Sequence, residues 1–114
     1  MKSILVRNSS IPKALSWFFP VAAITLWPFI LIRPGYDTDR LINHERIHIV
    51  QYNELLVLGF LLLYLWDWVV GLLKYRSTKT AYYQIRFEQE ARFGEGQEDY
   101  LEKRPKHSWL RFKV

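Results

Sequence analysis

The sequence predicts a mainly α-helical domain with a short β edge strand or hairpin, an α+β fold. Half of the residues are hydrophobic, and they concentrate in two blocks, 14–32 and 55–73. The second block has the length and composition of a helix, and its simplest interpretation is the buried helix of one small core. Within the first block, segment 25–33 combines β-branched and aromatic residues, which is typical of a strand.

A chain of 114 residues is expected to form one domain, 1–114. A capping serine before Pro12 predicts a short helix over 12–19. Segment 25–33 is predicted to be an edge strand, because Pro28 lies inside it and cannot donate to a β-ladder. Turn residues follow this strand at 34–37.

The longest predicted helix begins near Asp39, with Gly59 as its expected kink, and continues to about Arg76. A further helix is predicted from Ser77 or Thr78, carrying the sequence TKTAYYQIRFEQEARF. Gly94 and Gly96 then end that helix. One more short helix can precede Pro105, and we expect 1–10 and 97–114 to be flexible or peripheral.

Composition restricts the chemistry. The chain has no cysteine, which excludes disulfide frameworks, thiolate metal sites and cysteine nucleophiles. Any metal ion must therefore be bound by His, Asp or Glu, and the chain has three histidines.

The motif that carries chemistry is His44-Glu45-Arg46-Ile47-His48, an H-E-x-x-H sequence inside the longest predicted helix. Residues four apart lie on one helix face, so His44 and His48 can bind the same metal ion. Glu45 is rotated about 100° around the helix axis, and it flanks the metal without binding it. A metal ion lowers the pKa of water towards about 7, and a neighbouring carboxylate can then accept its proton.

A catalytic zinc ion needs a third protein ligand. The remaining histidine, His107, lies in a basic tail, so a carboxylate is the better candidate, and Glu88 and Glu90 lie together on a later predicted helix. Asn43 and Gln51 border the motif and are candidates to hold the second ring nitrogen of a ligand histidine.

His44-Glu45-x-x-His48 followed by Glu88-x-x-Ala91 resembles the gluzincin type of zinc metallopeptidase. The runs NHERIHIVQYNELL and AYYQIRFEQEA also look like a group of short bacterial proteins without an established activity, over about 24–92. The resemblance implies a minimal zincin-like helical domain with Zn²⁺ on His44, His48 and Glu88, Glu90 being the alternative third ligand. It also implies Glu45 as the general base.

This chain departs from the gluzincin pattern at Arg92, where the family has an Asp that steadies a ligand histidine. Asp67, Glu95 and Asp99 are the candidate substitutes. Peptidases of this type also bind an extended peptide or protein substrate beside an edge strand, which implies segment 25–33 here.

A peptidase needs a donor for the oxyanion that forms during hydrolysis. The sequence leaves four candidate donors open, namely Tyr82, Tyr83, Arg86 and His107.

A second hypothesis follows from charge and hydropathy. The net charge is +5, and the C-terminal run KRPKHSWLRFKV is basic and aromatic. We expect no nucleic-acid partner, because no recognisable binding module is present. Membrane contact through 55–73 and the C-terminus is the alternative, and a non-enzymatic membrane-associated protein would need no catalytic metal. No cleavable signal peptide is evident, which predicts a cytoplasmic or membrane-associated protein.

Overall fold

The structure, a computed structural model, describes residues 3–7, 9–12 and 22–114. The helix predicted over 12–19 falls mostly outside these residues. The described chain combines helices with a small sheet, which confirms the mainly α, α+β class. Its elements are β1 (Ile4–Val6), β2 (Ala23–Leu26), β3 (Phe29–Ile32), α2 (Asp39–Glu54), α3 (Leu58–Tyr75), α4 (Thr78–Gln84), α5 (Arg86–Gly94), α6 (Tyr100–Lys103) and the 3₁₀ helix η1 (Ser108–Arg111).

The sheet has the strand order β1-β3-β2, with β1 parallel and β2 antiparallel to β3. Segment 25–33 is therefore not one edge strand, as expected, but most of a hairpin that turns at Trp27–Pro28. Pro28 has no N–H to donate, so it fits a turn better than a ladder. β3 becomes the central strand, and β2 is the edge strand nearest the helices.

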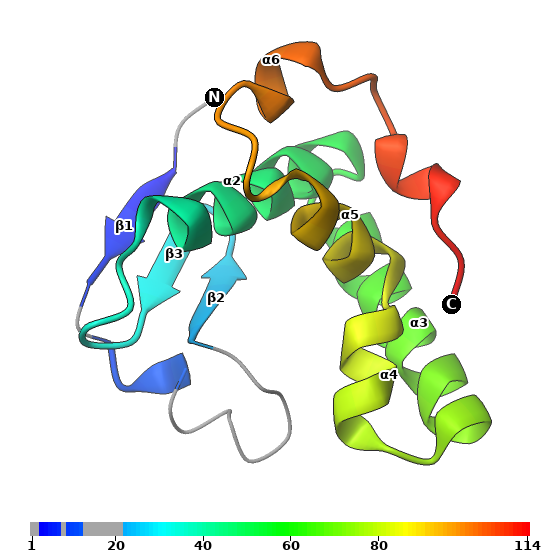
Figure 1. The fold of residues 1–114 in the computed structure, drawn as a ribbon. Coiled ribbons are helices and arrows are strands. Elements are labelled where there is room, and N and C mark those ends of the chain that lie inside the picture. Colours follow the sequence, from blue (N-terminus) through cyan, green and yellow to red (C-terminus); the bar gives the residue numbers. More distant parts are fainter. Residues whose placement is uncertain (1–2, 8, 13–21) are drawn as a thin grey trace.

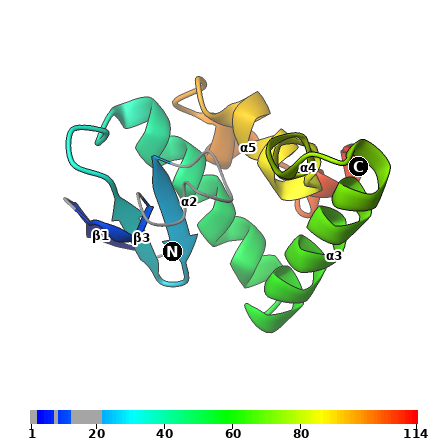
Figure 2. The ribbon, with the colours of Figure 1, turned by 90° about the horizontal axis from the view of Figure 1, so that it is seen from below.

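Helix α2 runs between the sheet on one side and α3, α4 and α5 on the other (Figures 1 and 2). Ile42 and Ile49 pack with buried residues of β3, whereas Ile47 packs with Ala91 of α5. The small Ala91 side chain, fully buried, lets the two helices approach closely. Because α2 is covered on both sides, His44, Glu45 and His48 are buried.

The long predicted helix breaks at residues 55–57, not at Gly59, which lies inside α3. Leu56 and Val57 adopt positive φ angles of 56° and 62°, which is unfavourable for such side chains. The corner brings Phe60 onto Tyr52, with ring centroids 3.8 Å apart, and onto Phe87 at 4.5 Å. This aromatic stack compensates for the backbone strain and forms the core under α3.

The helix predicted from Ser77 through 93 is divided in two at Ile85. Asp67, in the middle of α3, accepts hydrogen bonds from the backbone N–H and the guanidinium of Arg86, at 2.8–3.1 Å. A carboxylate at the first turn of α5 satisfies a backbone donor and favours the helix start there. This cap comes from a residue 19 positions away, so local sequence does not reveal it.

The short helix predicted before Pro105 is present as α6. We expected residues 97–114 to be flexible or peripheral. In the structure this segment contributes two buried aromatic residues, Tyr100 and Trp109. Trp109 joins the aromatic core, with its ring centroid 5.2 Å from that of Phe87. The C-terminal segment therefore covers part of α5.

Candidate metal centre

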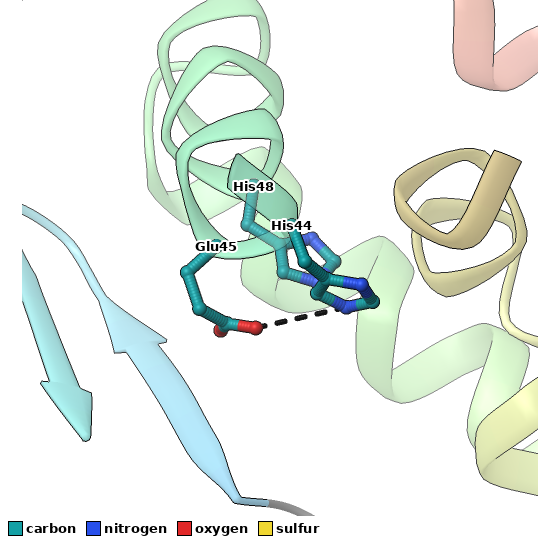
Figure 3. A group of neighbouring side chains, drawn as sticks. All are labelled: His44, Glu45 and His48. Carbon is teal, nitrogen blue, oxygen red and sulfur yellow. Dashed lines mark ion pairs between the residues drawn. The ribbon is translucent and has the colours of Figure 1, made fainter. Parts of the chain in front are cut away.

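His44, Glu45 and His48 all project from α2 into the space between β2, α3 and α5 (Figure 3). All three are buried, and each offers one donor atom within 4.8 Å of the others. The helical spacing expected from the sequence therefore produces a buried cluster that is able to hold a metal ion.

Glu88 completes this cluster from α5. Its Oε1 lies 3.1 Å from His44 Nε2, and its Oε2 lies 3.1 Å from His48 Nε2. His44 Nε2 is also 3.6 Å from Glu45 Oε2. Ligand atoms around a tetrahedral zinc ion, with bonds of about 2.0–2.1 Å, lie about 3.3 Å apart. The two separations between Glu88 and the histidines, 3.1 Å each, are close to that value.

The outer ring nitrogens of both histidines are held by acceptors. His44 Nδ1 lies 3.0 Å from Glu95 Oε1, and His48 Nδ1 lies 2.7 Å from Gln51 Oε1. The Gln51 amide nitrogen donates to the Phe87 carbonyl and to Glu90, which forces its oxygen towards His48. Each Nδ1 therefore carries a proton, and in the neutral ring each Nε2 presents its lone pair to the cluster.

His48 Nε2 is buried, and its neighbour at 3.1 Å is Glu88 Oε2, which does not lie in good hydrogen-bond geometry. Most buried polar atoms in proteins are fully hydrogen-bonded. A metal ion between His44, His48 and Glu88 would satisfy this nitrogen and the carboxylate together, so the donor set fits.

The charges of the cluster are coupled. Burial alone lowers the pKa of His44, but hydrogen bonds to Glu88 and Glu95 outweigh it and raise the pKa to about 10. Burial raises the pKa of Glu88, yet the two histidines more than reverse this and bring it well below its usual range. The carboxylate of Glu88 thus remains charged, as a metal ligand must.

Glu45 differs from the three ligand candidates because it faces β2. Its Oε1 accepts a hydrogen bond of 3.0 Å from the Thr25 hydroxyl. Burial raises the pKa of Glu45, and the neighbouring histidines only partly offset this. A cavity of about 120 Å³ opens beside the cluster and is lined by Glu45, His48 and Glu88, together with apolar residues of β2 and α3.

The other predicted site residues lie as follows. Glu90 points away from the histidines and pairs with Arg104, with Nε to Oε2 at 2.5 Å. The Asn43 amide donates to the backbone carbonyls of Gly94, Glu95 and Gln97, which fixes the end of α5 on α2.

Of the three substitutes for the missing Asp, Glu95 contacts His44, whereas Asp67 binds Arg86 and Asp99 pairs with Lys103. Arg92 itself donates to the Tyr83 carbonyl.

Among the candidate oxyanion donors, Tyr82 lines the cavity and donates to Glu88 Oε1 at 3.2 Å. Tyr83 and His107 are exposed, and Arg86 is engaged by Asp67.

Sequence reasoning missed Tyr64 and Thr25. Tyr64 donates to Glu88 Oε2 at 2.7 Å, and it shares one face of α3 with Phe60 and Asp67. That spacing, with two polar residues in an apolar helix, is the signal that could have identified it.

No protein-family model matches this chain, and neither the curated proteins nor the solved structures provide a match. The structure by itself shows a buried His44-Glu45-His48 cluster that is able to bind a metal ion, in a small α+β fold.

Proposed function

We propose that this protein is a zinc-dependent metallopeptidase in which His44, His48 and Glu88 hold the metal and Glu45 is the general base. Two histidines and one carboxylate are the zinc ligands of one major class of catalytic site. The observation that carries the proposal is the cavity, which reaches Glu45, His48 and Glu88. Structural zinc sites are closed by protein ligands, whereas catalytic sites keep one position accessible.

Bound zinc supplies Lewis-acid polarisation of a substrate carbonyl and of the attacking water. The Glu45 carboxylate accepts the proton of that water at the oxygen not held by Thr25, and delivers it to the leaving amine. Tyr82 is the candidate donor to the developing oxyanion.

An extended peptide is the substrate class that the site accommodates. β2 is the edge strand beside the cluster, and Thr25 on this strand contacts Glu45. A peptide added along β2 passes in front of the metal ligands. An apolar cavity of roughly 150 Å³ holds a benzene ring, so the cavity of about 120 Å³ suits one apolar side chain.

The experiment begins with metal analysis of the purified protein. We expect close to one zinc per chain, lost in His44→Ala and retained in the matched control His107→Ala, because His107 is exposed. A folded wild-type protein that contains no zinc and binds none when zinc is added would overturn the proposal.

Glu45→Gln separates a catalytic metal from a structural one. It removes the base but no ligand, so zinc content should stay constant while hydrolysis of a peptide library falls by about 100-fold or more. A zinc-loaded wild type that cleaves no peptide supports the non-enzymatic alternative, in which the metal only fastens α2 to α5.

A further inference from the structure

The outward face of α3 is apolar over its whole length. Leu58, Leu62, Leu65 and Leu73 recur at helical spacing and are between 56% and 77% exposed. Trp66, on the same side, is 65% exposed. Among the described helices, α3 alone is long and apolar enough to cross a membrane, and only 17% of it is buried. We call these five residues the α3 surface; contiguous exposed patches of this kind mark interaction sites.

The charges of α3 are arranged around this surface. Asp67 is the acidic residue of the helix, and it points inward, 1% exposed, onto the Arg86 guanidinium. Three exposed cations lie near the end of α3, namely Lys74 in its last turn, Arg76 directly after it and Lys79 in the first turn of α4. Lys74 Nζ also donates to the Val114 carbonyl at 3.3 Å. An apolar stripe that ends in cations matches a bilayer with anionic headgroups, because both parts of the surface find a complementary partner.

The inner side of α3 is covered. A Cβ added at Gly71 would lie 3.0 Å from Ala81, which shows how closely α4 approaches. Phe60 is buried against the aromatic core. Only one side of the helix is therefore available to lipid, which suits a helix that lies in the membrane interface instead of spanning the bilayer.

The exposed apolar residues extend to the mouth of the cavity. Leu26 of β2 and Leu61 of α3 both line the cavity, and each is 44% exposed. Leu56, at the corner between α2 and α3, is 85% exposed, and Trp27 at the hairpin turn is 40% exposed. Figure 2 shows the hairpin and the α2–α3 corner on the same side of the molecule.

We propose that the α3 surface binds the interface of an anionic lipid membrane, with α3 parallel to the membrane plane and the cavity mouth at its edge. This binding does not depend on the metal. If the proposed peptidase function holds, an inference that rests on it is that the substrates are apolar peptide segments at the membrane surface.

The test is flotation of the full chain with phosphatidylcholine vesicles, with and without phosphatidylglycerol. We expect binding that increases with the anionic lipid and falls with salt. Tryptophan fluorescence should shift to the blue on binding, and Trp66→Phe should remove most of that shift.

Leu62→Gln and Leu110→Gln form a matched pair, because both leucines are 61% exposed but lie on different elements, α3 and η1. Adding Leu73→Gln to Leu62→Gln should lower the partition coefficient by about tenfold or more, while Leu110→Gln should change it less than about twofold. Lys74→Gln should weaken binding to the anionic vesicles by about fivefold. Circular dichroism checks that each variant is folded.

The inference fails if wild type floats with neither vesicle, or if Leu110→Gln weakens binding as much as the α3 variant. It also fails if wild type is a dimer that Leu62→Gln dissociates, because a second copy then covers this surface. The flotation is repeated with a chelator, because we expect membrane binding to persist without metal. The absence of peptide hydrolysis would therefore overturn only the peptidase proposal.

Discussion

Two buried carboxylates on α5, those of Glu88 and Glu90, are compensated in different ways. Glu90 is fully buried and bonds the Arg104 guanidinium, the Tyr100 hydroxyl and the Gln51 amide. Glu88 is 4% exposed and meets two imidazoles and two tyrosine hydroxyls. Among the described residues, no lysine or arginine side chain bonds Glu88.

The difference separates a structural anchor, Glu90, from the proposed ligand, Glu88. Arginine stays protonated at any ordinary pH, so the charge of Glu90 is balanced permanently within the protein. An imidazole nitrogen can give up its proton to bind a metal ion, which then takes the place of that proton. The position two residues earlier on the same helix, Glu88, therefore suits the ligand role that we propose for it.

The largest expected effect is on stability, at Arg104. Its side chain is 3% exposed and also pairs with Glu54, with Nη2 to Oε1 at 2.8 Å. Arg104→Met leaves the buried charge of Glu90 without its cation, and we expect a loss of about 3–5 kcal/mol in the free energy of unfolding. Urea denaturation of the zinc-free protein measures it. Zinc stoichiometry should remain unchanged in the folded variant, because Glu88 is intact.

Lys103→Met is the control for this change. Lys103 is the preceding residue, 62% exposed, and its partner Asp99 is 58% exposed. An exposed pair of this kind contributes about 0–1 kcal/mol. Equal losses in the two variants would mean that the Glu90 anchor has no special role.

A pair of isosteric changes tests the comparison directly. In structural zinc sites, four protein ligands share roughly 10–16 kcal/mol of binding free energy, so one ligand contributes about 3–4 kcal/mol. Glu88→Gln should therefore weaken zinc binding by about 100- to 1000-fold, whereas Glu90→Gln should retain most of the affinity. Competition with a chromogenic chelator measures both. The same loss in both variants would contradict the assignment of Glu88 as the ligand.

The part of the site that sequence could predict is the part set by local spacing. His44 and His48 converge because they lie one helical turn apart, and Glu45 flanks them for the same reason. The resemblance to gluzincins indicated Glu88 as third ligand, with Glu90 left open. Only the packing of α5 on α2 decides which of the two carboxylates reaches the histidines. Ala91 packs against Ile47, and this contact places Glu88 beside His44 and His48.

The parts that sequence could not predict depend on contacts between distant residues. The division of the helix at Ile85 depends on Asp67, which lies on α3 and accepts from the Arg86 N–H. The central position of β3 depends on its pairing with β1, which is more than 20 residues earlier in the chain. Arg104 lies in a basic tail whose composition suggests a solvated segment, yet its guanidinium is buried. None of these partners is encoded by a local motif.

The smallest expected effect concerns Glu95, which lies three residues beyond the position where gluzincins have their Asp. Its carboxylate accepts from His44 Nδ1 at 3.0 Å and pairs with the exposed Arg40 at 2.6 Å. Hydrogen bonding to His44 lowers the pKa of Glu95, so the carboxylate is charged and orients the ring. Losing such a partner costs about 10- to 100-fold in metal affinity.

We therefore expect Glu95→Gln to weaken zinc binding by about 10- to 100-fold. Glu98→Gln removes the same charge from an exposed residue of the same loop, and it should change the affinity less than about twofold. Titration of both variants with zinc at one ionic strength separates orientation of His44 from bulk electrostatic attraction. An equal decrease in both would assign the effect to net charge, and then the contact with His44 does not orient the ligand.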